Sequence, residues 1–227
     1  VKVDPSKYDF NFFTATEYDK KLRTAEEWAG EFNAEIIINA GMYSLKKNHP
    51  NKGYLKNYDH YNNQTISGYY NAMMVSHPKD TLLPSFQIVD LTCTPWDSIK
   101  NRYHSYCQGM RMFDCNGNPM AFNKRPDQSC SMILLSTDIN GMIYIVFTRS
   151  PYTHRTMLKF LKSFPFELRQ TVYLEGGPEA SLYVKTENRE IRKFGCYVST
   201  TWERDDNDHF WELPNVIGIS KKVISNK

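Results

Sequence analysis

Four short loops of the sequence combine polar side chains with glycine or proline next to strand-like apolar runs. They are Asn39-Ala40-Gly41, Gln108-Gly109-Met110-Arg111, Arg149-Ser150-Pro151 and Glu175-Gly176-Gly177-Pro178-Glu179. Carboxylates can transfer protons to and from a substrate, and guanidinium groups bind phosphate through paired hydrogen bonds. The loops therefore predict parts of one site that acts on a charged substrate.

The loop at residues 175–179, here called the acidic diglycine turn, is the strongest of these signals. It follows the apolar run at residues 171–174 and places two carboxylates around two glycines. Glycine has no Cβ, so the amides of Gly176 and Gly177 can approach a ligand closely. This loop is the best single candidate for a functional site in the sequence.

Several common catalytic motifs are absent from the sequence. It has no Gly-x-Ser-x-Gly elbow, no phosphate-binding loop ending in Gly-Lys-Ser/Thr, no His-Glu-x-x-His helix and no dinucleotide-binding Gly-x-Gly-x-x-Gly after a strand. These absences argue against a serine hydrolase, a nucleotide hydrolase, a zinc protease and a dehydrogenase.

Composition and charge narrow the choice of partners. The chain has 28 basic and 25 acidic residues and a formal charge of +3, with no dense basic run that could follow a nucleic-acid backbone. Its longest apolar runs are strand-sized, well below the roughly 20 residues of a membrane helix. The five cysteines form no Cys-x-x-Cys pair, and their odd number leaves at least one thiol unpaired or bridging two molecules. We expect no nucleic-acid partner, no transmembrane segment in this chain and no structural zinc.

The elements that must position these loops are mostly strands. A capping box at residues 24–27 predicts a helix before a buried strand at residues 35–38. Residues 132–148 read as a hairpin, and Ser150-Pro151 fits the start of a further helix. We expect one α+β domain spanning residues 1–227, with a mixed β-sheet and hairpins backed by two or three helices.

The order of the loops resembles the phosphodiester glycosidase family. In that family a strand ends in an Asn-x-Gly-aromatic turn, a Gln-containing turn precedes a strand, another strand ends in Asp-Gly-Gly-Gly-Ser-Ser, and a Pro-Asn strand closes the fold. The matching segments, within about residues 35–220, are Asn39-Ala40-Gly41-Met42-Tyr43, Gln108-Gly109-Met110-Arg111, Leu174 through Leu182, and Leu213-Pro214-Asn215-Val216-Ile217-Gly218.

The chain departs from the family pattern inside the acidic diglycine turn. Glu175 replaces the Asp, Pro178 the third Gly, and Glu179 and Ala180 the two Ser residues. This version is similar to a bacterial branch that carries Arg-Ser-Pro-Tyr and Glu-Gly-Gly-Pro-Glu-Ala-Ser, present here as residues 149–152 and 175–181. A carboxylate and two glycines are kept while hydroxyls are lost, so the family's specificity does not carry over.

The resemblance implies a hydrolase that cleaves a sugar–phosphate diester on exported or cell-surface glycans, in the periplasm or at the cell surface. The catalytic residues would be Glu175, Glu179 and Arg111, with Glu175 ranked above Glu179 as the base. The residues expected to bind the glycan or sugar-phosphate substrate are Asn39, Gly41, Tyr43, Gln108, Arg149, Gly176, Gly177, Ser181 and Asn215. Arg111 and Arg149 would clamp the phosphate, which requires both to share one pocket with the acidic diglycine turn beside Asn39.

Two alternatives stay open at this point. The lost hydroxyls and the Tyr- and Asn-rich segment at residues 54–70 also fit a non-catalytic carbohydrate- or phosphate-binding protein on the same fold. A phosphoester hydrolase could instead use a divalent cation held by Glu175 and neighbouring Asp or Asn side chains. No motif assigns a metal ligand or another cofactor.

Overall fold

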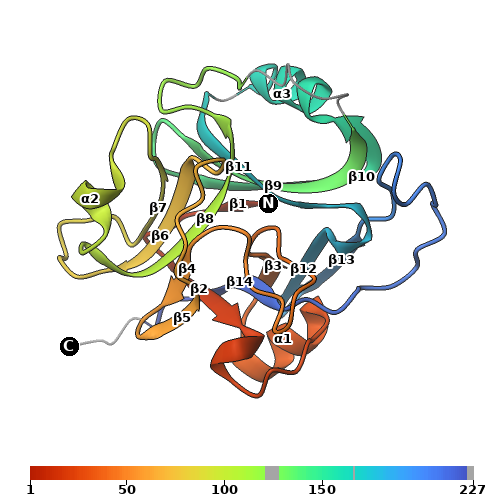
Figure 1. Ribbon diagram of the computed structural model, residues 1–227, viewed down its shortest axis with the longest axis horizontal. Coiled ribbons are helices and arrows are strands. Elements are labelled where there is room, and N and C mark those ends of the chain that lie inside the picture. Colours follow the sequence, from red (N-terminus) through yellow and green to blue (C-terminus); the bar gives the residue numbers. More distant parts are fainter. Residues whose placement is uncertain (121–127, 166, 224–227) are drawn as a thin grey trace.

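The computed structural model describes residues 1–120, 128–165 and 167–223. Strands dominate these residues, and every pairing between the named strands is antiparallel. The strands form two sheets, one of nine strands and one of five (Figure 1). The expected combination of sheet and helices agrees with this architecture. The expectation of a mixed sheet was wrong, because the paired strands run antiparallel to one another.

The first sheet has the order β1-β10-β9-β11-β8-β4-β5, and β6 joins it beside β8 with β7 at its outer edge. Its strands are β1 (Lys2–Val3), β4 (Leu55–Asn57), β5 (His60–Asn63), β6 (Ala72–Pro78), β7 (Phe86–Asp90), β8 (Tyr103–Phe113), β9 (Ser129–Asp138), β10 (Ile143–Thr153) and β11 (Leu168–Gly176).

The second sheet has the order β13-β12-β3-β14-β2. Its strands are β2 (Tyr8–Thr14), β3 (Ile36–Asn39), β12 (Ser181–Thr186), β13 (Arg189–Phe194) and β14 (Asn215–Lys221). The helices are α1 (Ala25–Phe32), α2 (Trp96–Ile99) and α3 (His154–Lys162), with 3₁₀ turns η1 (Ala15–Glu17) and η2 (Gly177–Glu179).

The main core lies where the two sheets meet. Its buried side chains include Phe12, Ile38 and Ile217 from the second sheet and Ile133 and Val172 from the first. Side chains alternate between the two faces of a strand, so each sheet gives one row of apolar residues to this core. Full burial of one such side chain contributes about 1.5–3 kcal/mol. This packing fixes the strand ends that carry the polar loops.

Helices cover the outer faces of the sheets (Figure 1). Helix α1 begins at the predicted capping box, in which the Thr24 side chain and the Glu27 backbone and side chain bond reciprocally. Helix α3 buries Met157, Leu158 and Leu161, as the spacing predicts. The predicted start of α3 at Ser150-Pro151 was wrong, because β10 continues through these residues.

Thr153 caps helix α3 instead: its hydroxyl accepts a hydrogen bond from the Thr156 backbone N–H at 3.1 Å.

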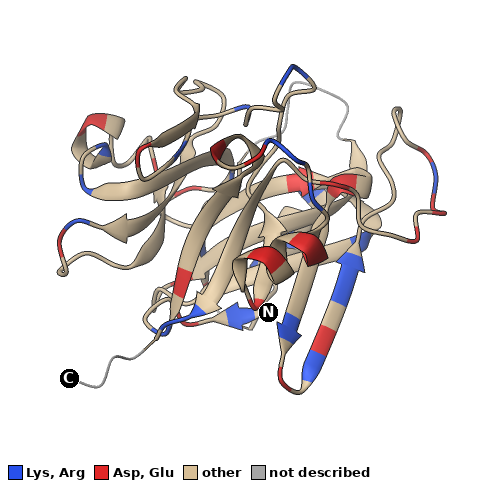
Figure 2. Cartoon of the chain, turned by 90° about the horizontal axis from the view of Figure 1, so that it is seen from below, with Lys and Arg blue, Asp and Glu red and all other residues tan. Residues whose placement is uncertain are grey.

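Charges of opposite sign lie next to each other on the second sheet and its helix (Figure 2). Arg192 of the basic strand β13 pairs with Glu26 in the first turn of α1. Such interleaved charges favour a solvated surface over a nucleic-acid interface. Within the described residues, no helix has the length and apolar character needed to cross a membrane.

Cys93 and Cys115 form a disulfide across 22 residues of sequence. Cys107, Cys130 and Cys196 lie outside this disulfide, and all three are buried. The odd number of cysteines therefore leaves buried thiols inside the chain.

Candidate active site

The acidic diglycine turn connects the two sheets. Strand β11 of the first sheet ends at Gly176, the turn η2 follows, and β12 of the second sheet begins at Ser181. Gly177 has a φ of +73°, and a Cβ at this position would lie 2.4 Å from Val198 Cγ2. Both the left-handed backbone and the close contact require glycine there. The chain thus turns sharply between the sheets with a carboxylate on each side.

Glu175 and Glu179 act on each other electrostatically. Burial first and the neighbouring charge of Glu179 second raise the pKa of Glu175 to about 8, although the Gly176 N–H and Lys52 partly oppose the shift. Burial also raises the pKa of Glu179, again partly opposed by Lys52. Two interacting carboxylates in a partly buried site titrate as a pair. At neutral pH the pair holds a proton, and Glu175 is the carboxyl that keeps it.

Two tyrosines and one lysine surround this pair. Burial raises the pKa of Tyr43, and the charges of Glu179 and Glu175 add to the effect. The pKa of Tyr70 rises through burial and the charge of Glu175. Lys52 is exposed and lowers the pKa of both glutamates. The site therefore presents neutral phenols and one ammonium group around a pair of carboxyls.

The side chains of Tyr173, Cys130 and His154 pack behind the acidic diglycine turn. A Cβ on Gly176 would lie 2.2 Å from the Tyr173 hydroxyl and 2.9 Å from Cys130 Sγ. The ring of His154 lies 4.8 Å from the ring of Tyr173. Burial is the largest cause of a strongly raised pKa at Tyr173, with smaller contributions from Cys130 and Glu175. This packing contributes to the partial burial of Glu175, and burial is the largest cause of its raised pKa.

Asn39 and Ser181 hold the turn in place. The Asn39 side chain donates to the Glu179 carbonyl at 2.9 Å and accepts from the Ser181 N–H at 2.7 Å. The Ser181 hydroxyl donates to the same Glu179 carbonyl at 3.0 Å. Asn39 is 1% exposed, and both polar ends of its side chain are occupied. The sequence placed these residues correctly beside the acids, and their bonds position the Glu179 backbone.

Gln108 ties the tyrosine-bearing loop to the first sheet. Its side-chain oxygen accepts from the Tyr54 and Ser67 N–H groups, and its nitrogen donates to the Ser67 and Tyr70 carbonyls. The side chain is fully engaged and 1% exposed. Gln108 therefore fixes Tyr70 near Glu175 rather than contacting a substrate itself.

Asn215 and Gly41 support the loop that carries Lys52. Asn215 donates to the His49 carbonyl at 3.2 Å and accepts from the Asn62 side chain at 3.1 Å. A Cβ on Gly41 would lie 3.1 Å from Asn51 Oδ1, so a small residue there lets the two segments pack. Asn215 and Gly41, both predicted to bind substrate, therefore help to position the loop that carries Lys52.

Arg111 belongs to a separate buried group. Its guanidinium contacts the Asp90 carboxylate at 2.5 Å, and the two side chains are 11% and 0% exposed. Asp90 also accepts from the N–H of Thr92 and of Cys115. The charges that shift the pKa of Glu175 do not include Arg111. The expected phosphate clamp at this residue is therefore replaced by an ion pair with Asp90.

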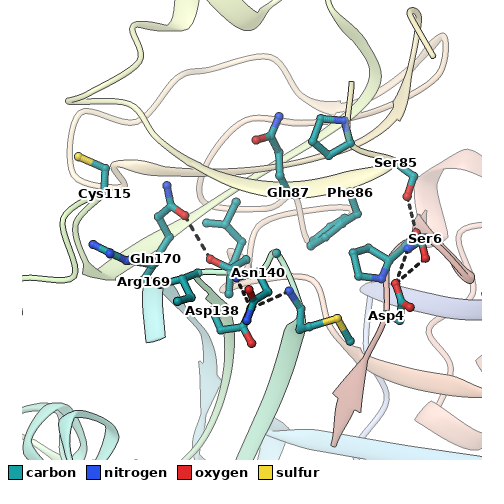
Figure 3. Close-up of a pocket in the computed structure, with 17 residues that line it drawn as sticks. Asp4, Ser6, Ser85, Phe86, Gln87, Cys115, Asp138, Asn140, Arg169 and Gln170 are labelled. Carbon is teal, nitrogen blue, oxygen red and sulfur yellow. Dashed lines mark hydrogen bonds between the residues drawn. The ribbon is translucent and has the colours of Figure 1, made fainter. Parts of the chain in front are cut away.

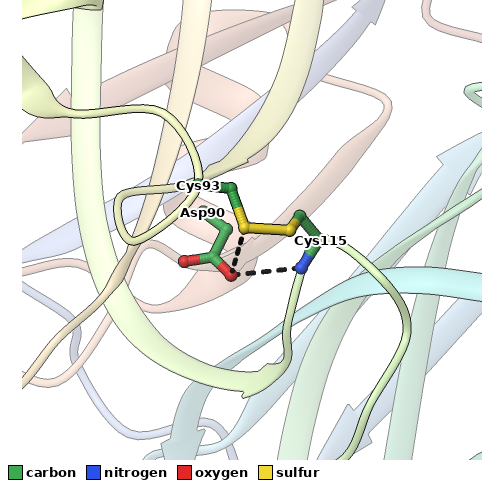
Figure 4. A group of neighbouring side chains, drawn as sticks. All are labelled: Asp90, Cys93 and Cys115. Carbon is green, nitrogen blue, oxygen red and sulfur yellow. Dashed lines mark hydrogen bonds between the residues drawn. A yellow bond between two sulfur atoms is a disulfide. The ribbon is translucent and has the colours of Figure 1, made fainter.

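Within the described residues, one set of potential metal ligands lies close enough together to share an ion, namely Asp90, Cys93 and Cys115 (Figure 4). Both sulfur atoms are joined in the disulfide, so neither is a thiolate that could bind a cation. This group therefore offers one carboxylate that already pairs with Arg111.

Replacing Arg111 by Met should lower stability and leave catalysis in the folded protein nearly unchanged. The substitution leaves a buried carboxylate without its counter-charge, and the Thr92 and Cys115 donors compensate in part, so we expect a loss of about 2 kcal/mol. Urea unfolding measures this loss. A fall of kcat by two orders of magnitude in protein that is still folded would instead return Arg111 to the active site.

Arg149 braces the long loop between β13 and β14. Its guanidinium donates to the carbonyls of Phe194, Asp205 and Asn207 and to the Asp205 carboxylate. The Asn207 side chain in turn donates to the Gly195 carbonyl at 2.7 Å. Arg149 thus holds the loop between β13 and β14 in place. Its guanidinium is engaged by these protein groups, which leaves the expected phosphate clamp without its second arginine.

Two cavities lie away from the acidic diglycine turn. One of about 590 Å³ lies between the start of β7 and the residues around Asp138, and Arg169 and Gln170 help to line it (Figure 3). Another of about 350 Å³ lies between β10 and α3. Neither is lined by Glu175 or Glu179. The electrostatics of the site, rather than cavity volume, mark the acidic turn.

Sequence reasoning missed Lys52, Tyr70 and Tyr173. Tyr70 ends the aromatic segment that suggested a sugar-binding rim, so composition alone pointed to its neighbourhood. Lys52 follows two other lysines of the same loop, Lys46 and Lys47, and nothing in the local pattern separates it from them.

Comparison with known proteins rests on structure, because no family model and no curated protein matches the sequence. The zebrafish N-acetylglucosamine-1-phosphodiester alpha-N-acetylglucosaminidase catalytic domain, auto-inhibited by its pro-peptide, matches with a TM-score of 0.66 at 11% identity over 96% of this chain and 74% of that chain. A hypothetical protein from Synechocystis matches with a TM-score of 0.62 at 11% identity over 97% of this chain and 58% of that chain. The likeness shows the fold, which is phosphodiester glycosidase-like.

Proposed function

We propose that this chain hydrolyses a sugar–phosphate diester at the Glu175–Glu179 pair. The observation that carries the proposal is the pair of interacting carboxyls, one protonated at neutral pH, on a turn built of two glycines. The structural likeness to a catalytic domain that acts on a phosphodiester of N-acetylglucosamine supports the choice of reaction.

The two carboxyls take different roles in this reaction. Glu179 activates a water molecule, whose oxygen bonds to the anomeric carbon while its proton passes to the carboxylate. The bond from that carbon to the phosphate oxygen breaks, and its electron pair leaves with the phosphate monoester. Glu175 donates a hydrogen bond to the departing oxygen, which needs little protonation because a phosphate is already a good leaving group. This reverses the sequence-based ranking of Glu175 as base, because the proton stays on Glu175.

Tyr43 and Tyr70 are suited to the sugar. Both phenols are protonated at neutral pH, since burial raises their pKa values above the ordinary 10.0, and each can donate a hydrogen bond as well as offer a ring face. We propose that they bind the sugar hydroxyls, and that the natural substrate is an exported or cell-surface glycan. Fractionation of the native host that recovers the protein with the cytosol would contradict this location.

The proposal is tested with a panel of sugar 1-phosphate alkyl diesters and detection of free sugar by chromatography. The expected result is release of one sugar with its phosphate monoester. Retention of a glycan without product across the panel would favour the non-catalytic binding protein. Loss of activity on chelation, restored by a divalent cation, would favour the metal-dependent hydrolase.

The pH profile of kcat/KM should be bell-shaped. Glu179 must be ionised, and its raised pKa sets an acidic limb above the ordinary carboxyl value of 4.5. Glu175 must be protonated, so activity should fall again as the pH passes about 8. Initial rates across this range, at constant ionic strength, provide the measurement. A profile that stays flat through the alkaline region would remove the proton-donor role of Glu175.

A further inference from the structure

The loop that carries Lys52 is fixed on both sides of that residue. The Lys52 backbone N–H donates to the Met42 carbonyl at 2.8 Å, and Tyr43 pairs with Asn51 in an antiparallel bridge. The buried Asn51 side chain donates to the carbonyls of Gly53 and Gln108. The backbone is therefore held in place beside the site, while the Lys52 side chain itself is exposed.

Lys52 differs from the two predicted phosphate-binding arginines in having no ion-pair partner among the described residues. Arg111 pairs with Asp90 and Arg149 with Asp205, and Lys52 forms no ion pair with any described residue. Asn39 bonds to the Glu179 carbonyl, and three residues further along the chain the Met42 carbonyl accepts from the Lys52 N–H, so the Lys52 backbone lies beside the acidic diglycine turn. The charge of Lys52 also lowers the pKa of both glutamates. A solvated ammonium beside two carboxyls, one of them neutral, leaves positive charge available for an anion.

We propose that Lys52 binds the phosphate of the diester substrate, an inference that rests on the proposed hydrolase function. A lysine ammonium is a compact point charge with three donors and suits a phosphate that gains charge. The diester carries one negative charge, and the leaving monoester gains a second as the glycosidic bond breaks. The attraction to Lys52 therefore grows toward the transition state, which affects kcat as well as substrate binding.

The test compares two substrates that share a sugar and differ in the leaving group. One is the sugar 1-phosphate alkyl diester, and the other is the neutral nitrophenyl glycoside. For Lys52→Gln, kcat/KM on the diester should fall about 100-fold and change only a few-fold on the neutral glycoside. Lys52→Arg should restore a large part of the loss, and Lys47→Gln, an exposed lysine of the same loop, should match wild type.

Equal losses on both substrates would mean that Lys52 only tunes the carboxyls, and this would overturn the proposal. An unchanged kcat/KM on the diester in Lys52→Gln would overturn it too.

Inorganic phosphate separates this inference from the proposed function. Phosphate titrations followed by ³¹P NMR should detect binding to wild type and a Kd about tenfold weaker for Lys52→Gln. Sugar release by wild type with equal phosphate binding in both proteins would reject the role of Lys52 alone. If wild type releases no sugar from either substrate, the hydrolase function fails, and loss of phosphate binding in Lys52→Gln would still place an anion at this residue. Absence of both activities would reject both proposals.

Discussion

Glu175→Gln should lower kcat on a sugar–phosphate diester about tenfold, because the departing phosphate oxygen needs a hydrogen bond from the carboxyl more than a full proton transfer. Glutamine keeps the shape of the side chain, but it cannot supply the shared proton that the carboxyl holds up to a pH of about 8. The alkaline limb of the pH profile should disappear in any activity that remains. The exposed Glu187, in the turn between β12 and β13, provides a matched control, since Glu187→Gln should match wild type. Unchanged turnover in Glu175→Gln would reject the assigned mechanism.

The same variant should be more stable than wild type at alkaline pH. Glu175 has a higher pKa in the folded chain, about 8, than its ordinary value of 4.5, so the folded state binds this proton more tightly. Its contribution to stability is therefore full below pH 4.5 and is lost as the pH rises through about 8. One pKa unit corresponds to about 1.4 kcal/mol, and after relaxation of the site we expect a gain of about 2 kcal/mol for the glutamine.

Urea unfolding of both proteins at several pH values measures this difference. It should be small in acid and grow toward alkaline pH, because only wild type must ionise a buried carboxyl. A variant that loses both activity and stability at every pH would indicate damage to the turn instead of removal of a proton.

Local patterns predicted the parts of the molecule that depend on neighbouring residues in sequence. The capping box at Thr24 needs three residues of separation, and the apolar face of α3 follows from helical spacing. Asn39 was also placed correctly beside the acidic turn, although its partner Glu179 is 140 residues away. The family motif supplied that long-range information, because composition and periodicity contain none.

The roles of the cations could not be predicted from sequence. An arginine on an alternating strand pairs with whichever carboxylate the fold brings to it, and Asp90 lies 21 residues from Arg111 on a different strand. Arg149 meets its partners in a loop more than 50 residues away. The ammonium of Lys52 stays available because the fold gives it no partner among the described carboxylates, and no local pattern records that outcome.

Gly195→Ala should destabilise the protein by about 3 kcal/mol and impair catalysis in whatever folds. A Cβ at this position would lie 2.0 Å from the Gly177 carbonyl oxygen and 2.9 Å from Ser131 Cβ. Backbone cannot yield as a flexible side chain can, so relief of the contact must displace the acidic diglycine turn. Denaturant unfolding and kcat/KM measure the two effects together.

Gly30→Ala is the matched control, because nothing lies within 4 Å of a Cβ there. This site is inside helix α1, where alanine should stabilise by about 0.5–1 kcal/mol. Stability of Gly195→Ala equal to wild type would mean that the turn has room to move. A mobile turn could not hold Glu175 in the partly buried position beside Glu179 that raises its pKa. The Gly195→Ala variant thus tests whether the acidic diglycine turn is rigid enough to keep the proton on Glu175.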